Sequence, residues 1–340
     1  MRASRRGFRK HGAQRRSKAA IRRPLLEGLE YRTLLSIGVS GYDPVQGIVT
    51  LMADGSGDVL VLGQQPAPSI DGQPMVVVHN LPFSPDTPSE LNSPIDFDPL
   101  IMGDQPLVIG DGIDPNITID MTQGTNDVSL DDSWAYNEPI SLTGNLGVGE
   151  QTTLTSAVPG SNTWALSGPN SGSIAGSVTF SDVKVLNAAA TNTDTLQGQG
   201  TVAATWLLGA NGIASYSVAG DSSTFSNFKA LQAGSGNNTF ELKGDGSIWS
   251  VQLLGGVGND TYRFYNTAVL DGSIDGGAGS NTLSYYDGTA GYSGPINLSL
   301  TDAAPLVGYS GIDPMGMTIT GTFTDITAVV ARPAAGSVPS

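Results

Sequence analysis

The stretch TFSDVKVLNA at residues 179–188 returns as TFSNFKALQA at residues 224–233 and again as TFTDITAVVA at residues 322–331. The first two copies start 45 residues apart, and the third starts 98 residues later, about twice that step. Repetition at a fixed period is typical of stacked units that cannot bury their apolar faces alone. The sequence therefore predicts a solenoid.

Tryptophans mark nearly the same period. Trp164, Trp206 and Trp249 follow one another at intervals of 42 and 43 residues, and each begins a short segment of strand-like composition. Two landmarks that share one period indicate that the repeat is structural. We therefore expect the three indole rings to lie in register, in equivalent positions of successive units.

A glycine-rich motif divides this period in half. It reads AGSGNNTFE at residues 233–241, GGVGNDTYR at 255–263 and GGAGSNTLS at 276–284, with starts 22 and 21 residues apart. Each copy joins a Gly-x-Gly turn to Asn or Asp, which tolerate left-handed backbone geometry, and then to Thr and an aromatic residue or Leu. We predict an all-β fold, a β-solenoid resembling a parallel β-helix, with rungs of roughly 21 residues.

The composition agrees with an all-β chain and excludes several kinds of chemistry. The 340 residues include 45 Gly and only 14% charged residues, without a sustained apolar pattern at helical spacing. There is no Cys, which excludes disulfides, thiolate catalysis and cysteine-bound metals. No run of ~18 apolar residues occurs, so we predict no membrane span.

Charge is strongly segregated along the chain. Residues 1–32 hold 11 of the 16 Lys and Arg residues, whereas the rest of the chain has 5 basic and 29 acidic residues. Such a basic block predicts a disordered targeting segment, with a nucleic-acid-binding arm as the alternative. Because the acidic body would repel phosphates along its whole length, we expect no nucleic-acid partner.

A motif follows the basic block directly, in RPLLEGLEYRTLLS at residues 23–36. It resembles the LEPR-XLL amino-terminal motif of large repetitive surface or secreted proteins, typical of planctomycete bacteria, with Tyr31 where Pro is usual. The resemblance implies export or surface association. The spacing of the leucines also fits a short amphipathic helix. The matching residues are Arg23, Leu26, Glu27, Leu29, Glu30, Arg32, Leu34, Leu35 and Ser36.

Prolines mark the best candidate domain boundary, because ten of the 20 lie between residues 64 and 115. Before them, GIVTLMADGSGDVLVLG (47–63) predicts a hairpin turned at residues 54–57, and after them NITIDMTQGTNDVSL (116–130) predicts another. We divide the chain into a targeting segment (1–36), a β hairpin or cap (37–63), a Pro-rich linker or insertion (64–115), a second β cap (116–140), the repetitive β-solenoid (141–331) and a tail (332–340).

GGVGNDTYR at residues 255–263 also resembles the nine-residue calcium-binding repeat of RTX (haemolysin-type) proteins. The resemblance implies a Ca²⁺ ion held by Asp carboxylates and turn carbonyls. The neighbouring copies carry Asn238 and Asn281 where Asp is usual, so the competing interpretation is that these residues only turn the rungs. The candidate calcium ligands are Asp260, Asp271, Asp275 and Asn281.

The sequence contains few of the residue patterns that indicate catalysis. His11 lies in the basic segment and His79 stands alone in the body, so neither a zinc site nor a catalytic triad is indicated. No Gly-x-Ser-x-Gly elbow or Walker loop occurs. We therefore predict a protein that is not an enzyme. The alternative is a carbohydrate-active β-helix, either a carboxylate-dependent hydrolase or a carbohydrate-binding module that stacks sugars on its tyrosines.

Taken together, the sequence predicts a non-catalytic structural or adhesive β-solenoid, exported or bound to the cell surface. Its expected partners are cell-surface or matrix polysaccharides or proteins. Calcium, bound weakly, is the cofactor that the RTX resemblance suggests.

Overall fold

The regular secondary structure of the described residues is almost wholly β-strand, as predicted. The structure is a computed structural model that describes residues 38–43, 48–52, 59–65, 75–80, 107–109, 116–132, 134, 139–244, 247–286, 291–304 and 308–331. The predicted targeting segment (1–36) and tail (332–340) lie outside the described residues.

Within the described residues the strands form two long sheets and one short one. The 14-stranded sheet contains, in spatial order, β1 (Gly38–Asp43), β2 (Ile48–Met52), β6 (Asn116–Asp120), β8 (Ile140–Thr143), β12 (Val178–Ser181), β11 (Ser171–Ile174), β10 (Thr163–Gly168), β14 (Thr195–Gln197), β18 (Ala230–Gln232), β21 (Gln252–Leu254), β24 (Ile274–Asp275), β28 (Thr322–Ile326), β27 (Gly308–Ile312) and β26 (Ser299–Ala304).

The 13-stranded sheet contains β29 (Ala328–Val330), β25 (Thr282–Ser284), β22 (Thr261–Phe264), β19 (Thr239–Leu242), β15 (Thr205–Leu208), β16 (Ala214–Val218), β17 (Asp221–Ser226), β13 (Val185–Ala188), β9 (Thr152–Ser156), β7 (Asn126–Leu130), β3 (Val59–Gln65), β4 (Met75–Asn80) and β5 (Leu107–Ile109). The short sheet pairs β20 (Ile248–Trp249) with β23 (Val269–Leu270). A 3-10 turn, Ala210–Gly212, lies between β15 and β16.

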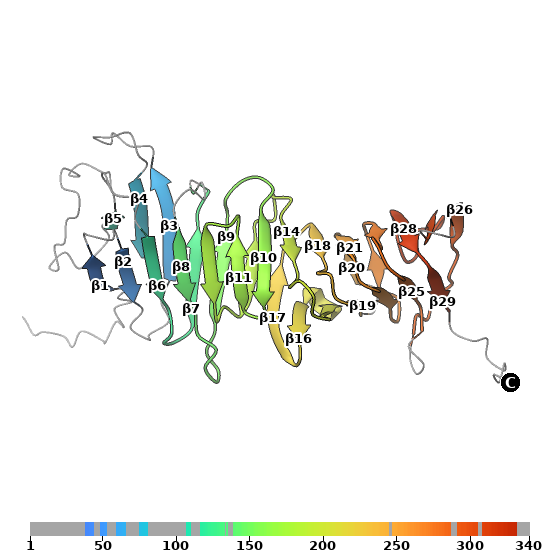
Figure 1. The fold of residues 1–340 in the computed structure, drawn as a ribbon, viewed down its shortest axis with the longest axis horizontal. Helices are drawn as coiled ribbons and strands as arrows, with labels where there is room; N and C mark the ends of the chain where they lie inside the picture. The colour runs from blue at the N-terminus through green and yellow to red at the C-terminus, as the bar shows by residue number, and fades with distance from the viewer. Residues whose placement is uncertain are drawn as a thin grey trace, which may run out of the picture. The chain divides into compact units, whose positions relative to one another are not determined.

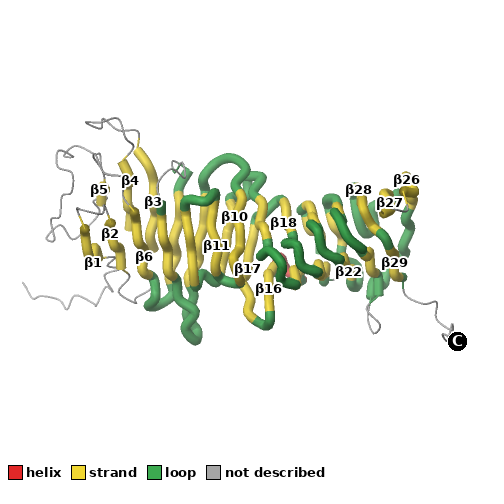
Figure 2. The backbone as a smooth tube through the Cα atoms, in the orientation of Figure 1, coloured by secondary structure: helices red, strands yellow, loops and turns green. Residues whose placement is uncertain are grey.

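The chain winds into a coil by crossing repeatedly between the two long sheets. Strands β6, β8, β14, β18, β21 and β24 belong to one long sheet, and β7, β9, β13, β19, β22 and β25 to the other. Successive crossings stack parallel strands in register, and in Figure 1 the colours run along the stack in chain order. Figure 2 shows how loops alternate with these strands. The predicted β-solenoid fold class is confirmed.

The core lies between the two long sheets, because strand side chains alternate between inside and outside. Register partners repeat the same inward position from coil to coil, so apolar side chains stack in columns. One column runs through Trp164, Leu196, Leu231, Leu253, Ile274 and Phe323, each no more than 1% exposed. Each coil therefore buries its apolar face against its neighbours.

The predicted rung of about 21 residues describes only the shortest coils. Thr239, Thr261 and Thr282 are register partners on successive strands, and their spacing of 22 and 21 residues matches the glycine-rich motif. Elsewhere a coil is lengthened by extra strands. Thr205 pairs with Thr239, which follows 34 residues later, because the antiparallel strands β16 and β17 intervene.

Each copy of the TFS repeat closes a three-stranded antiparallel meander: β10–β11–β12, β15–β16–β17 and β26–β27–β28. The fourth residue of each copy turns the chain toward the opposite sheet. Asp182, Asn227 and Asp325 hold positive φ angles of 56°, 66° and 55°. Asn and Asp are the non-glycine residues that adopt this conformation most readily, which explains their place in the repeat.

The expectation that the three tryptophans lie in register is wrong. Trp164 lies in the 14-stranded sheet, Trp206 in the 13-stranded sheet and Trp249 in the short sheet. Between β10 and β15 the chain crosses from one long sheet to the other three times. Because this number is odd, the next copy of the unit begins on the opposite face.

The hairpins predicted at residues 47–63 and 116–130 are also wrong. In both places the first strand belongs to the 14-stranded sheet and the second to the 13-stranded sheet, and they pair with neighbouring coils instead of with each other. Alternating apolar residues around a glycine turn fit a hairpin and a half-coil equally well. Regular coiling therefore begins before residue 141. Two strands of the predicted linker, β4 and β5, extend the edge of the 13-stranded sheet.

Candidate functional site

The calcium-like motif places three polar side chains in one column inside the coil. Asn238, Asp260 and Asn281 stand immediately before the register-paired strands β19, β22 and β25, and none of them is more than 2% exposed. Their φ angles are not positive, so left-handed turning is not the reason for Asn or Asp here. We call this column the amide ladder.

Hydrogen bonds run along the amide ladder from coil to coil. The backbone N–H of Ala204 donates to Oδ1 of Asn238 over 3.2 Å. The N–H of Asn238 donates to Oδ1 of Asp260 over 2.7 Å, and the N–H of Asp260 donates to Oδ1 of Asn281 over 3.0 Å. Each side-chain oxygen thus satisfies a buried backbone donor of the preceding coil.

The second side-chain atom of each asparagine faces the turn of its own coil. Nδ2 of Asn238 donates to the carbonyl oxygens of Gly234 (3.3 Å) and Gly236 (2.6 Å). Nδ2 of Asn281 donates to the carbonyl oxygen of Gly277 (3.2 Å). Such bonds stabilise the glycine turns, because they give a hydrogen-bond partner to carbonyl groups that folding removes from water.

Asp260 differs from its neighbours because its second oxygen cannot donate when the group is ionised. Oδ2 of Asp260 is buried and has no hydrogen-bond partner among the described residues. Burial raises the pKa of this carboxyl group from 3.8 to about 6, and the hydrogen bonds from Asn238 oppose the rise only in part. A buried carboxylate whose lone pairs are unsatisfied favours its neutral form.

A second buried aspartate, Asp194, shows the opposite arrangement. Its Oδ1 accepts hydrogen bonds from the backbone N–H (2.9 Å) and Nδ2 (3.2 Å) of Asn162. Its Oδ2 accepts the indole N–H of Trp164 over 3.3 Å. Both carboxylate oxygens of Asp194 therefore have donors, as a buried carboxylate requires.

Of the four predicted calcium ligands, the structure brings Asp260 and Asn281 together in the amide ladder. Asp271 instead accepts hydrogen bonds from the hydroxyls of Ser250 (2.9 Å) and Thr320 (2.8 Å), which lower its pKa. Asp275 is exposed on β24 and accepts the N–H of Gly277 over 3.0 Å. Among the described residues no group of three Asp, Glu, His or Cys side chains is placed to hold a metal ion.

Asp275 has an acidic neighbour, Asp325, that is not among the four predicted ligands. Burial raises the pKa of Asp325, and the nearby carboxylate of Asp275 raises it further. The signal was present in the TFTD repeat, whose corner residue stacks over the glycine turn. The carbonyl of Asp325 accepts Nδ2 of Asn281 over 3.0 Å, so the ladder ends against this corner.

The outward faces of the two long sheets differ in charge. None of the seven adjacent strands β8, β12, β11, β10, β14, β18 and β21 contains a charged residue. We call this surface the neutral face. Its outward side chains are mostly hydroxyls and amides: Ser141, Thr143, Thr179, Ser181, Ser173, Thr163, Ala165, Ser167, Thr195, Gln197, Gln232, Gln252 and Leu254. The flanking strands carry Asp120 and Asp275.

The 13-stranded sheet carries a charged cluster on its outer surface. Glu241 lies 2.6 Å from Nζ of Lys243 and 3.4 Å from Arg263. The Lys243 ammonium also lies 4.9 Å from the centre of the Tyr265 ring. Since these groups are partnered with one another at a surface, they stabilise the fold little and offer no isolated charge to a substrate.

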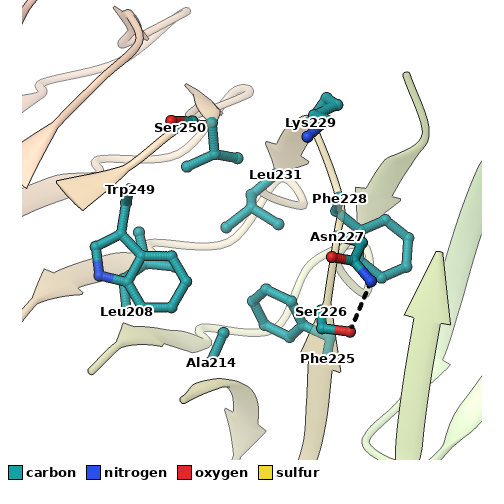
Figure 3. Close-up of a pocket in the computed structure, with 11 residues that line it drawn as sticks. Leu208, Ala214, Phe225, Ser226, Asn227, Phe228, Lys229, Leu231, Trp249 and Ser250 are labelled. Carbon is teal, nitrogen blue, oxygen red and sulfur yellow. Dashed lines mark hydrogen bonds between the residues drawn. The ribbon is translucent and has the colours of Figure 1, made fainter. Parts of the chain in front are cut away.

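A pocket of about 130 Å³ opens beside β18, where the second meander ends (Figure 3). Apolar side chains surround it, including Phe225, Phe228, Leu231 and Trp249. Lys229 is the titratable residue among those that line it. A glycosidase requires a pair of carboxyl groups, and the lining of this pocket has none.

The tyrosines and phenylalanines of the glycine-rich coils fill the interior. Tyr262, Phe264 and Tyr285 are fully buried, and burial raises the pKa of both tyrosine hydroxyls. They are therefore not available as a sugar-stacking strip on the surface.

Among the described residues no helix is long and apolar enough to cross a membrane. Comparisons with protein-family models, with curated proteins and with solved structures found no match. The fold and its surfaces define a polar-faced β-solenoid, and function is argued from them.

Proposed function

We propose that this protein is a non-catalytic adhesive β-solenoid, exported to the cell surface or matrix, which holds a neutral polysaccharide on its neutral face. The observation that carries the proposal is the absence of charge from seven adjacent strands of a chain with a net charge of −15. In the 13-stranded sheet, by contrast, charged residues interrupt the strand order at β22, β19, β17 and β7, which carry Arg263, Glu241, Asp221 and Asp127.

A surface without charge suits a neutral partner, because the centre of a binding surface is normally depleted of charged groups. Removing a charged side chain from water costs far more than removing a hydroxyl that regains a hydrogen bond. Stacked hydroxyl and amide groups such as Ser141, Thr179 and Gln232 can exchange hydrogen bonds with water for bonds with sugar hydroxyls. Neighbouring strands repeat such groups every ~4.8 Å along the sheet, so a long polymer would meet many weak contacts at once.

Two further observations support export and the absence of catalysis. The LEPR-XLL-like motif at residues 23–36 supports export by resemblance. Two carboxylates that the structure brings together, those of Asp275 and Asp325, are not among the residues that line the pocket beside β18. The contacts described above therefore favour a scaffold over a hydrolase. Fractionation of expressing cells should place the chain outside the cytoplasm.

The proposal is tested by co-sedimentation of the full chain with insoluble neutral polysaccharides, cellulose and β-1,3-glucan. Ser141→Glu combined with Gln232→Glu adds two charges to the neutral face, and we expect at least a tenfold loss of binding. The matched control, Thr153→Glu with Thr239→Glu, adds the same charge to the 13-stranded sheet and should bind as the wild type does.

Three outcomes would contradict this function. The wild type could fail to bind either polysaccharide while it captures a protein component of the matrix. Both double variants could lose binding equally, which would indicate a general effect of charge. Release of reducing ends from the polysaccharide would show that the protein is a hydrolase.

A further inference from the structure

We propose that the protonation state of Asp260 controls the contact between neighbouring coils. A protonated Asp260 completes the amide ladder as an asparagine would, and ionisation of Asp260 loosens the coil that contains β22. The proposal concerns how the scaffold responds to its surroundings and does not depend on the polysaccharide partner.

The geometry shows that Asp260 occupies an asparagine position. In Asn238, Asp260 and Asn281 alike, Oδ1 accepts the backbone N–H of the preceding coil. A Cβ atom built on Gly255 would lie 2.7 Å from Oδ2 of Asp260, and one built on Gly276 would lie 2.7 Å from Nδ2 of Asn281. Oδ2 of Asp260 therefore stands where its neighbours carry an amide nitrogen.

That position requires a hydrogen-bond donor. The amide nitrogens of Asn238 and Asn281 donate to the carbonyl four residues earlier, that of Gly234 and of Gly277. The corresponding carbonyl for Asp260 is that of Gly256, which already accepts the N–H of Ala278 over 2.9 Å. Oδ2 of Asp260 has no hydrogen-bond partner among the described residues. A protonated carboxyl group has an O–H to donate from this position, whereas a carboxylate has only acceptors.

The neighbouring titratable groups do not relieve an ionised Asp260. The hydroxyl of Tyr262, on the same coil, donates over 3.0 Å to the backbone carbonyl of Asp275. Asp275 lies on β24 of the next coil, where its side chain is exposed, and Asp325 lies on β28, one coil further. Arg263 follows on β22 but pairs with Glu241 on the outward side of the sheet.

The direction of the pH effect follows from a comparison of the pKa of Asp260 in the folded chain with its pKa in the unfolded chain. Burial raises the pKa of Asp260 from 3.8 to about 6, so the folded chain holds this proton more tightly than the unfolded chain does. Its contribution to stability is fully present below about pH 4 and is lost as the pH rises through about 6. The expected loss is roughly a hundredfold in the local folding equilibrium, about 2.7 kcal/mol.

The experiment compares the full-length wild type with Asp260→Asn by hydrogen exchange of residues 255–264 between pH 3 and 7.5. Exchange at each pH is expressed as the ratio between the two proteins, which cancels the intrinsic pH dependence. We expect equal protection near pH 3, a ratio that rises in favour of Asp260→Asn from about pH 4, and a plateau of about a hundredfold above about pH 6. Asp275→Asn removes an exposed neighbouring charge and should leave this pH dependence in place.

A ratio that stays constant across this range would overturn the proposal, as would a transition that survives in Asp260→Asn. If Asp260→Asn does not fold, ¹³C carboxyl spectra of the Asp-labelled wild type decide the matter. The proposal requires an aspartate resonance that titrates near pH 6 and that persists in Asp325→Asn, and it is wrong if every aspartate titrates below pH 5.

Discussion

The rings of Phe240 and Tyr262 lie face to face, with centroids 5.1 Å apart and planes 3° from parallel. The two residues are register partners on β19 and β22, so the stacking of the rings follows from the stacking of the coils. Trp206 continues the column on the other side of Phe240, at 5.6 Å and 13°. One aromatic ring thus contacts both the coil before it and the coil after it.

Phe240→Ala should lower the free energy of unfolding by about 3–5 kcal/mol, because it removes a fully buried ring between two flat neighbours that cannot collapse into the space. Urea denaturation followed by tryptophan fluorescence measures the change. Ile248→Ala is the control, since Ile248 is 66% exposed and should change stability by less than about 0.5 kcal/mol. Similar losses for both variants would show that the aromatic column does not stabilise the stack.

Asp194→Asn should destabilise the protein at neutral pH, in contrast to the expected effect of Asp260→Asn. Both oxygens of Asp194 accept hydrogen bonds, from Asn162 and from the Trp164 indole. An amide would set its N–H₂ group against one of these donors, at a cost of about 1–3 kcal/mol. Thermal melts of both variants at pH 7.5 test the pair. If the two substitutions shift the melting temperature in the same direction, the contrast between the two aspartates is wrong.

Part of this arrangement could be predicted from the sequence, because it is determined by residues that are close together in the chain. The length of the shortest coils follows from the glycine-rich motif, because tight turns need glycine. The corner residues Asp182, Asn227 and Asp325 fit the TFS repeat, because few residues accept positive φ. Such features depend on neighbours in the chain alone.

Other features depend on contacts between distant segments and could not be predicted. The same alternation of side chains fits a strand that returns in a meander and a strand that crosses to the opposite sheet. The sequence therefore could not show to which sheet each tryptophan belongs. Likewise, Asp260 looks like a calcium ligand in sequence. Only the register with Asn238 and Asn281 shows that its oxygens face the backbone of neighbouring coils.

Gly258→Ala should disrupt the stacking of the glycine turns. A Cβ at this position would lie 1.9 Å from the carbonyl oxygen of Gly236 in the adjacent coil, so the two turns would have to separate. We expect a loss of more than about 2 kcal/mol in the free energy of unfolding. Gly200→Ala is the matched control, because a Cβ there meets nothing within 4 Å. Comparable stability of both variants in urea would contradict the close approach of the turns.

Calcium at millimolar concentration should raise the melting temperature little, because the four candidate ligands do not converge. Asp260 and Asn281 already bond to the backbone of adjacent coils, and Asp271 is bonded to Ser250 and Thr320. A ligand that binds only the folded chain must stabilise it in proportion to its affinity, so a melt with calcium or with a chelator measures the site directly. Asp260→Asn provides the comparison. A clear rise in the wild type that disappears in this variant would establish calcium at the amide ladder and would show that the coils part to admit the ion.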